Sequence, residues 1–280
     1  MATAAGARVF IEGIALWSAR LPGWDAARPI LRGEAIPAVA PAPRPAPALL
    51  APTERRRAPD SVAIALEVAS AACSSAGRPA GTLASVFAST FGDTAVSDYL
   101  CSQLARAPLD TSPTKFHNSV HNAAAGYWAI ATGCSQPYTA ITAHQHTFGA
   151  GLAIACTHAL AAEAAVLYVA YDIETPGPLA TMSSSRGVLG AALVLAPAPS
   201  PRALARLDVH IEEGEARATP ARAANAALVE GNAMSSCLAL FEVLAETLPV
   251  RADRAGAPRR EVVLTLAPRL LLRLEIAAVS

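Results

Sequence analysis

Two uninterrupted apolar runs, at residues 166–171 and 187–195, constrain the fold of this chain more than any other feature. Strands that are apolar at every position are typical of sheets with both faces buried, because a strand with one face in water alternates apolar and polar residues. Just before these runs, a strand over residues 138–143 and a helix over residues 147–162 complete a βαβ unit. We therefore expect an α/β fold, in which helices cover a central sheet on both sides.

Helices and strands also alternate through the rest of the sequence. The hydrophobic pattern predicts helices over residues 60–76, 94–105, 121–133 and 232–247, and strands over residues 9–16, 82–89, 205–212, 262–266 and 271–276. The helix over residues 60–76 should be capped by Asp60 or Ser61 and should end at Gly77.

Residues 37–59 are rich in proline, at a spacing that prevents a regular helix or central strand and favours an extended polyproline conformation. We interpret this segment as a long surface excursion. The alternative is a ligand for a proline-binding module.

The composition narrows the class of protein. With 280 residues, 53% of them hydrophobic, the chain can bury one large domain over residues 1–280. We divide this domain into a first half at residues 9–196 and a truncated second half at residues 200–280. The 22 basic and 22 acidic residues cancel, so neither nucleic acid nor an anionic membrane surface is an expected partner. No apolar stretch reaches the roughly 20 residues of a membrane span.

The cysteines and the single lysine exclude further chemistries. Five cysteines without a C-x-x-C pair argue against a disulfide framework and for a reducing, cytoplasmic location. Residues 1–13 lack the pattern of a signal peptide. Since Lys115 is the only lysine and no glycine directly precedes it, the chain has no P-loop. We expect no cofactor and no metal.

More specific segments point to a family. Residues 112–126 read Ser-Pro-Thr-Lys-Phe-His-Asn-Ser-Val-His-Asn-Ala-Ala-Ala-Gly, and residues 186–195 read Arg-Gly-Val-Leu-Gly-Ala-Ala-Leu-Val-Leu. In their order and in their spacing around the strand at residues 138–143, these segments resemble the β-ketoacyl synthases, over about residues 9–195. The resemblance implies a thiolase-like layered αβαβα fold with a shortened C-terminal half.

The resemblance also locates the position of the catalytic nucleophile. In active members, the strand like residues 138–143 delivers a cysteine to the start of the next helix, where backbone N–H groups and the helix dipole lower the pKa of the thiol. Counting back from the strand at residues 166–171 without gaps puts His146 at this position, and one residue of slack puts Gln145 there. Neither side chain forms an acyl thioester, so we expect no condensing activity.

The assisting groups of active members are missing as well. Those enzymes use two histidines to activate malonyl-thioester, the first in a His-Gly-Thr context, and this chain contains no His-Gly pair. Asn232 stands where the second histidine, which follows a glycine at a helix start, would be. The Gly-Phe-Gly loop near the C-terminus of active members is also absent.

Among relatives without a catalytic set, the resemblance is strongest to the chain-length-factor subunits of bacterial heterodimeric ketosynthases. The short forms of aryl polyene pathways share the run Phe-His-Asn-Ser-Val-His-Asn. The resemblance implies two partners, an active β-ketoacyl synthase and an acyl carrier protein that bears an acyl or polyene chain. It assigns the interface with the synthase to His117, His121, Asn122 and Gly126. We assign the degenerate pocket and tunnel to His144, Thr147, Phe148 and Met182.

Two other functions stay open at this point. The chain could act alone as a malonyl-thioester decarboxylase or acyltransferase that uses the degenerate pocket. It could also be a decayed homodimeric relative without a role in a pathway.

Four smaller features each have two interpretations. The histidine pairs 117/121 and 144/146 could converge on a metal, although hydrogen-bonded histidines near a subunit contact fit better. Cys134 is either a reactive thiol or a small buried residue. Residues 183–186 are either a phosphate cradle or a polar loop. The arginines at 55–57 either contact an acidic carrier protein or are solvated.

Overall fold

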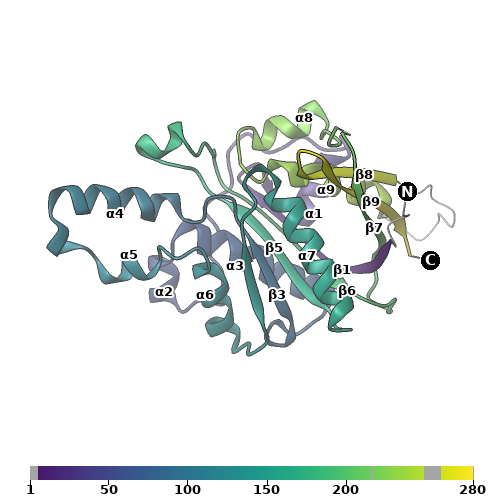
Figure 1. The fold of residues 1–280 in the computed structure, drawn as a ribbon, viewed down its shortest axis with the longest axis horizontal. Coiled ribbons are helices and arrows are strands. Elements are labelled where there is room, and N and C mark those ends of the chain that lie inside the picture. Colours follow the sequence, from purple (N-terminus) through teal and green to yellow (C-terminus); the bar gives the residue numbers. More distant parts are fainter. Residues whose placement is uncertain (1–5, 216, 249–259, 280) are drawn as a thin grey trace.

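The computed structural model describes residues 6–215, 217–248 and 260–279 (Figure 1). The two ends of the predicted single domain, residues 1–5 and 280, lie outside the described residues. One mixed sheet of nine strands runs through the described part of the chain, in the order β4-β3-β5-β6-β1-β7-β9-β8. The short β2 (Leu21–Pro22) pairs with the end of β1.

The first arm of the sheet, β4-β3-β5-β6-β1, contains the strands of the first half of the chain. These strands are β1 (Ala7–Ser18), β3 (Ala84–Ala88), β4 (Tyr138–Ile141), β5 (Val166–Asp172) and β6 (Leu189–Ala196). Every residue of β5 and β6 is buried, as the two apolar runs predict. β3 lies between β4 and β5 and is parallel to both, so the predicted βαβ unit spans an intervening strand.

The second arm, β7-β9-β8, continues the sheet from β1. It contains β7 (Ala205–Glu213), β8 (Arg260–Ala267) and β9 (Leu270–Ala278), all antiparallel to their neighbours. β7 pairs only with the first five residues of β1, Ala7 to Ile11.

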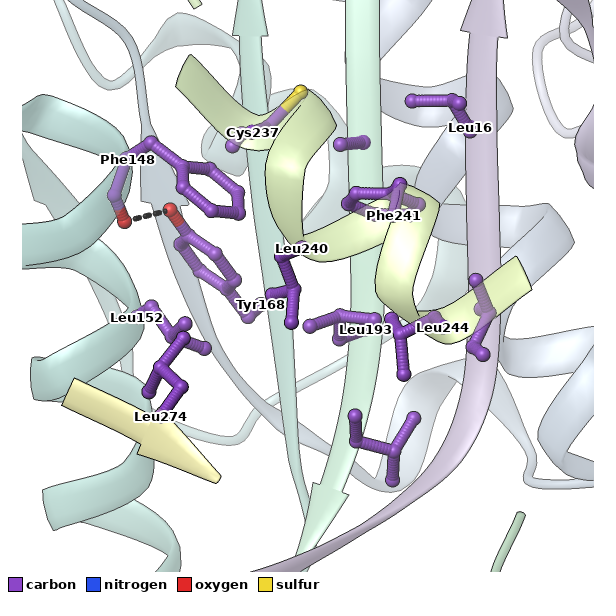
Figure 2. Close-up of a cluster of buried hydrophobic side chains, with 14 of the residues drawn as sticks. Leu16, Phe148, Leu152, Tyr168, Leu193, Cys237, Leu240, Phe241, Leu244 and Leu274 are labelled. Atoms are coloured by element: carbon purple, nitrogen blue, oxygen red, sulfur yellow. Dashed lines mark hydrogen bonds between the residues drawn. The ribbon is translucent and has the colours of Figure 1, made fainter. Parts of the chain in front are cut away.

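Helices form two further layers. α3 (Asp60–Ala76) and α6 (Ala123–Thr132) pack on one face of the first arm. α7 (Thr147–Ala161) and α9 (Leu238–Thr247) lie between the arms, since α7 contacts β5 and β8 and α9 contacts β8 and β9. Figure 2 shows the core that results, in which Phe148 of α7, Leu240 of α9 and Leu274 of β9 surround Tyr168. The layers of the described residues therefore follow as α, β, α and β, which confirms the α/β fold and gives four of the five layers of the expected αβαβα order.

The outer face of the second arm is polar. Leu207 and Val209 of β7 point into the core, so the alternating Arg206, Asp208 and His210 point outward. Ion pairs join neighbouring strands on this face, for example Arg273 of β9 to Glu212 of β7 at 3.0 Å. The first arm thus has helices on both faces, and the second arm has a core face and a charged face.

Several element boundaries differ from those expected. Pro59, not Asp60 or Ser61, is the N-cap of α3, and Ser61 donates a hydrogen bond to Asp93 instead. Gly77 ends α3 in the left-handed region, as predicted. α9 begins six residues later than expected, after a 3-10 turn over Ser235–Cys237.

The proline-rich segment is mostly exposed, but it contains a short helix, α2 (Pro52–Arg57), that the sequence did not predict. Pro52 is compatible with this helix because the first helical position needs no N–H donor. Three other helices were also not predicted: α1 (Trp24–Leu31), α5 (Pro113–His117) and α8 (Ala223–Ala226). α4 (Thr94–Arg106) was expected, and with α5 it extends away from the sheet (Figure 1). Within the described ranges, no helix has both the length and the apolar character needed to cross a bilayer.

Candidate functional site

A single 3-10 turn over His144–His146 joins β4 to α7. His144 adopts φ +52°, a left-handed conformation that is uncommon for a residue with a side chain. Thr147 fixes this conformation, since its Oγ1 accepts a hydrogen bond from the Ala143 N–H at 2.9 Å and donates one to the His144 carbonyl at 2.6 Å. Backbone held in this way is often found at functional sites.

Gln145 and His146, the two candidates for the nucleophile position, lie in this turn. Nδ1 of His146 is 3.0 Å from Oγ1 of Thr265 in β8, and its Nε2 is 3.3 Å from Nε2 of Gln145. If the Gln145 amide donates to Nε2, the imidazole proton is on Nδ1 and is directed at Thr265. The imidazole is therefore attached to the second arm, and the turn offers no sulfur.

A cavity of about 730 Å³, which we call the turn cavity, opens beside these residues. Gln145, His146 and Gly149 form one wall, and Leu264 and Thr265 of β8 form another. Most of the remaining lining is small and apolar: Ala218, Ala221, Ala223, Ala226, Ala227, Gly231 and Ala239. Since no lysine or arginine lines the cavity, it is better suited to a neutral group than to a phosphate.

The alanine-rich wall is fastened to β8 of the second arm and to helix α9. Thr219 exchanges two hydrogen bonds with Val263 of β8, at 2.8 and 2.9 Å. The backbone N–H of Arg222 donates to the carboxylate of Glu242 in α9 at 3.0 and 3.1 Å. These contacts hold the wall in place over the turn.

Asn232, which the sequence resemblance assigns to the position of the second catalytic histidine, is buried and does not line the turn cavity. Its Nδ2 contacts the carbonyls of Arg186 at 2.9 Å, Gly187 at 3.3 Å and Asp172 at 3.4 Å. Its Oδ1 accepts a hydrogen bond from the N–H of Met234 at 3.0 Å. The amide thus joins three segments of backbone, and both of its polar atoms form hydrogen bonds within the chain.

The four residues assigned to the pocket and tunnel do not line the turn cavity. Thr147 is buried in the turn, and Phe148 lies in the core with its ring 5.7 Å from that of Tyr168 (Figure 2). His144 is exposed, and Met182 is 86% exposed in the loop after β5. Sequence reasoning missed the alanine-rich wall, although the run Ala-Arg-Ala-Ala-Asn-Ala-Ala at residues 221–227 was a visible signal. The sequence had no signal for Thr265.

A second concave surface, which we call the edge groove, lies along β4. It has a volume of about 650 Å³ and is formed by α5, α6, β4 and residues near α2. Four large apolar side chains in it are exposed to solvent: Phe116 by 66%, Val120 by 53%, Ile130 by 81% and Tyr138 by 41%. β4 is the last strand of the first arm, and among the described strands only β3 pairs with it. Exposed apolar surface beside a free sheet edge is typical of a protein interface.

Three of the four predicted interface residues line the edge groove: His117, Asn122 and Gly126. The Asn122 amide donates to the hydroxyl of Tyr138 at 3.3 Å. A Cβ placed on Gly126 would meet no atom within 4 Å, so no contact inside the described chain requires a glycine there. His121 instead points inward, with Nε2 2.9 Å from the carbonyl of Ser89.

A buried carboxylate links the loop after β3 to Asn232. Asp172, which is 1% exposed, accepts hydrogen bonds from the Ser89 hydroxyl at 2.8 Å and from the backbone N–H groups of Thr90 and Phe91. Burial raises the pKa of Asp172, and these hydrogen bonds oppose the shift. The backbone carbonyl of Asp172 is one of the three carbonyls that Asn232 contacts. The only sequence signal for this role was a carboxylate directly after an apolar strand.

The smaller candidate features have ordinary surroundings. No group of three or more histidine, cysteine or acidic residues within the described part of the chain could hold a metal. The Cys134 thiol donates to the Leu83 carbonyl, and Ser185 is buried and accepts from the N–H of Ala233. Arg55 binds the carbonyls of Ala48 and Leu50, whereas Arg56 and Arg57 are exposed.

Comparisons with known proteins agree with this geometry. The family model of the β-ketoacyl synthase N-terminal domain matches residues 31–248. No curated protein matches the sequence.

Among solved structures, one similar chain belongs to a ketosynthase (ApeO) in complex with its chain length factor (ApeC) from Xenorhabdus doucetiae. The TM-score is 0.70 at 17% identity, over 95% of this chain and 98% of that one. The ishigamide ketosynthase/chain length factor gives a TM-score of 0.72 at 16% identity, over 98% of this chain and 100% of that one. A type II polyketide synthase complex of an acyl-carrier protein with its ketosynthase (AntDE:AntF) gives 0.71 at 10% identity, over 98% and 100%.

Proposed function

Since the chain belongs to the β-ketoacyl synthase family, we propose that it is a non-catalytic subunit of the chain-length-factor type, which pairs with an active ketosynthase. The observation that carries this proposal is the edge groove. There, four large apolar side chains are exposed beside the edge of β4 that no described strand covers. A partner of the same fold would cover these side chains and pair with β4. Burial of that surface would supply the main driving force for association.

Gly126 supports the same interface. A glycine inside a helix costs about 1 kcal/mol relative to alanine, and no neighbour within the described chain explains its presence in α6. A glycine on an exposed helix face lets the backbone of a partner approach closely. Gly126 is therefore best explained by a contact outside this chain.

The degenerate turn supports the non-catalytic part of the proposal. Condensation needs a nucleophile that forms an acyl thioester, and the turn presents Gln145 and His146. Asn232 is bound to backbone on all sides and cannot replace a catalytic histidine. We propose that the partner synthase performs the chemistry and that this chain helps to shape the space for the growing chain.

The finer parts of the proposal concern the pathway and the carrier. We propose a bacterial fatty acid or polyketide pathway of the aryl polyene type, a cytoplasmic location, and the division of the domain into residues 9–196 and 200–280. An acyl carrier protein is the second proposed partner. Arg56 and Arg57 are exposed on α2, next to the edge groove, where they would attract an acidic carrier.

Co-expression with a ketosynthase encoded beside this chain tests the proposal. We expect a stable 1:1 complex on gel filtration, in which the ketosynthase gains condensing activity. The control replaces this chain by its Ile130→Arg variant, which puts a charge into the edge groove. A folded, stable monomer that forms no complex with the ketosynthase would contradict the proposal.

A second candidate function, malonyl-thioester decarboxylation by this chain alone, is favoured by one observation. The turn cavity remains open at about 730 Å³ although the nucleophile is absent, and a glutamine amide lines it. Incubation of the purified chain with malonyl-carrier protein tests this function by release of carbon dioxide. If the purified chain has this activity and both Gln145→Ala and His146→Ala lose it, decarboxylation replaces the proposal of a non-catalytic subunit.

A further inference from the structure

A third concave surface, which we call the tryptophan cleft, shares no residue with the turn cavity or the edge groove. It has a volume of about 580 Å³ and lies between the end of β1, the start of α1 and the exposed side of α3. Trp17 and Trp24 line it, and they are two of the three tryptophans of the chain. Asp25, Glu67, Ser74 and Ser75 provide its polar side chains.

The charge of this cleft has one sign. Asp25 and Glu67 are its only charged lining residues, and no lysine, arginine or histidine is among them. In a chain with 22 basic and 22 acidic residues, this separation from basic groups is local. Asp25 has a structural reason for its position, because it lies in the first turn of α1 and complements the helix dipole.

Glu67 has no such reason. It is partly buried on α3, and among the described residues no hydrogen bond or ion pair reaches its carboxylate. The four buried acidic residues of the described chain, Glu12, Asp172, Asp208 and Glu242, all have such partners. Burial is the only cause that raises the pKa of Glu67. A partly dehydrated carboxylate without a counter-charge leaves room for a cation from outside.

We propose that the tryptophan cleft binds a small organic cation, with its ammonium group between the indole rings and the Glu67 carboxylate. Indole is the aromatic group that attracts an ammonium most strongly, and partial dehydration strengthens both this attraction and the attraction to Glu67. The apolar part of the ligand would contact Pro22, Val68 and Ala71. A cleft of this size accommodates one small molecule.

Calorimetric titration of the full chain with choline tests the site. The matched control ligand is 3,3-dimethylbutan-1-ol, in which a carbon atom replaces the quaternary nitrogen of choline, so that the shape is kept and the charge is lost. We expect choline to bind at least about tenfold more tightly than the neutral compound, because only choline gains from the rings and the carboxylate. Equal affinity of the two compounds, or no heat with choline, would contradict the proposal.

Two variants locate the binding. Glu67→Gln keeps the shape of the side chain and should weaken choline binding about tenfold, whereas Glu215→Gln, at an exposed glutamate outside the cleft, should leave it unchanged. Trp17→Phe should weaken binding by a smaller factor. Circular dichroism confirms that each variant is folded. Unchanged binding in Glu67→Gln would refute the site, and complex formation with a ketosynthase should be normal in all three variants.

The pH dependence gives an independent readout. Choline binds to the ionised carboxylate, and the pKa of Glu67 is raised, so binding should weaken as the pH falls towards that raised pKa, earlier than for an ordinary glutamate. Asp25 is the only other titratable group that lines the cleft. In Glu67→Gln this early weakening should disappear. If wild type and variant lose binding over the same pH range, Glu67 is not the counter-ion.

Discussion

The turn cavity and the edge groove differ in what their side chains already contact. At the turn, His146 is engaged within the chain by Thr265, and Asn232, which lies outside the turn cavity, is likewise engaged by three carbonyls. In the edge groove, large apolar side chains such as Phe116 and Ile130 are exposed. Polar groups that are satisfied inside a chain stabilise that chain, whereas uncovered apolar surface favours association. This difference is what the proposed function predicts for a subunit that acts through a partner.

The largest effect should come from a charge in the edge groove. Ile130→Arg should weaken the complex with a ketosynthase at least about 100-fold, because a buried, unpaired guanidinium is costly at an interface. Ile130 is 81% exposed, so the variant should fold normally. Ile36→Arg is the matched control, since Ile36 is 93% exposed and lies outside the groove. Binding is measured by calorimetry, and equal affinities of the two variants would remove the main difference between the two regions.

The next effect concerns the loop after β3, whose Ser89 carbonyl contacts His121 next to the edge groove. Asp172→Ala should lower the free energy of unfolding by about 3 kcal/mol, because the N–H groups of Thr90 and Phe91 lose a buried acceptor. Urea denaturation measures this loss, with the exposed Asp110→Ala as the control. A loss below about 1 kcal/mol would show that the loop after β3 does not depend on the Asp172 carboxylate.

Cysteine substitutions sharpen the description of the turn. In a Cys101→Ser background, Gln145→Cys should be alkylated about tenfold faster than His146→Cys, because position 145 is exposed and position 146 is partly covered. Burial raises the pKa of the Cys156 and Cys237 thiols to about 12, so they should stay unmodified. Mass spectrometry after iodoacetamide treatment locates the label. Faster labelling of His146→Cys would mean that the second arm covers the turn less than the structure indicates.

The smallest effect should come from the contact between His146 and the second arm. Thr265→Val removes a hydroxyl of almost the same shape and should lower the free energy of unfolding by about 1 kcal/mol. The complex with a ketosynthase should be unaffected, since Thr265 lines the turn cavity and not the groove. A double-mutant cycle with His146→Ala measures the coupling. Additive losses would show that this hydrogen bond contributes nothing to stability.

The sequence by itself determined the fold class, the order of most elements and the absence of a thiol at the turn. Apolar runs at residues 166–171 and 187–195 require burial on both faces, and periodicity is a local property that the chain carries without its fold. The resemblance of residues 112–126 located the helix of the edge groove for the same reason.

Only the tertiary structure decided which side chains meet. The contact between His146 and Thr265 joins residues 119 positions apart, and Asn232 reaches carbonyls 45 to 60 positions away. It also decided that Phe148 lies in the core and that Glu67 has no partner among the described residues, because the packing of neighbouring elements determines which surroundings a side chain has. Local patterns specify elements, but burial and pairing are properties of the packed chain.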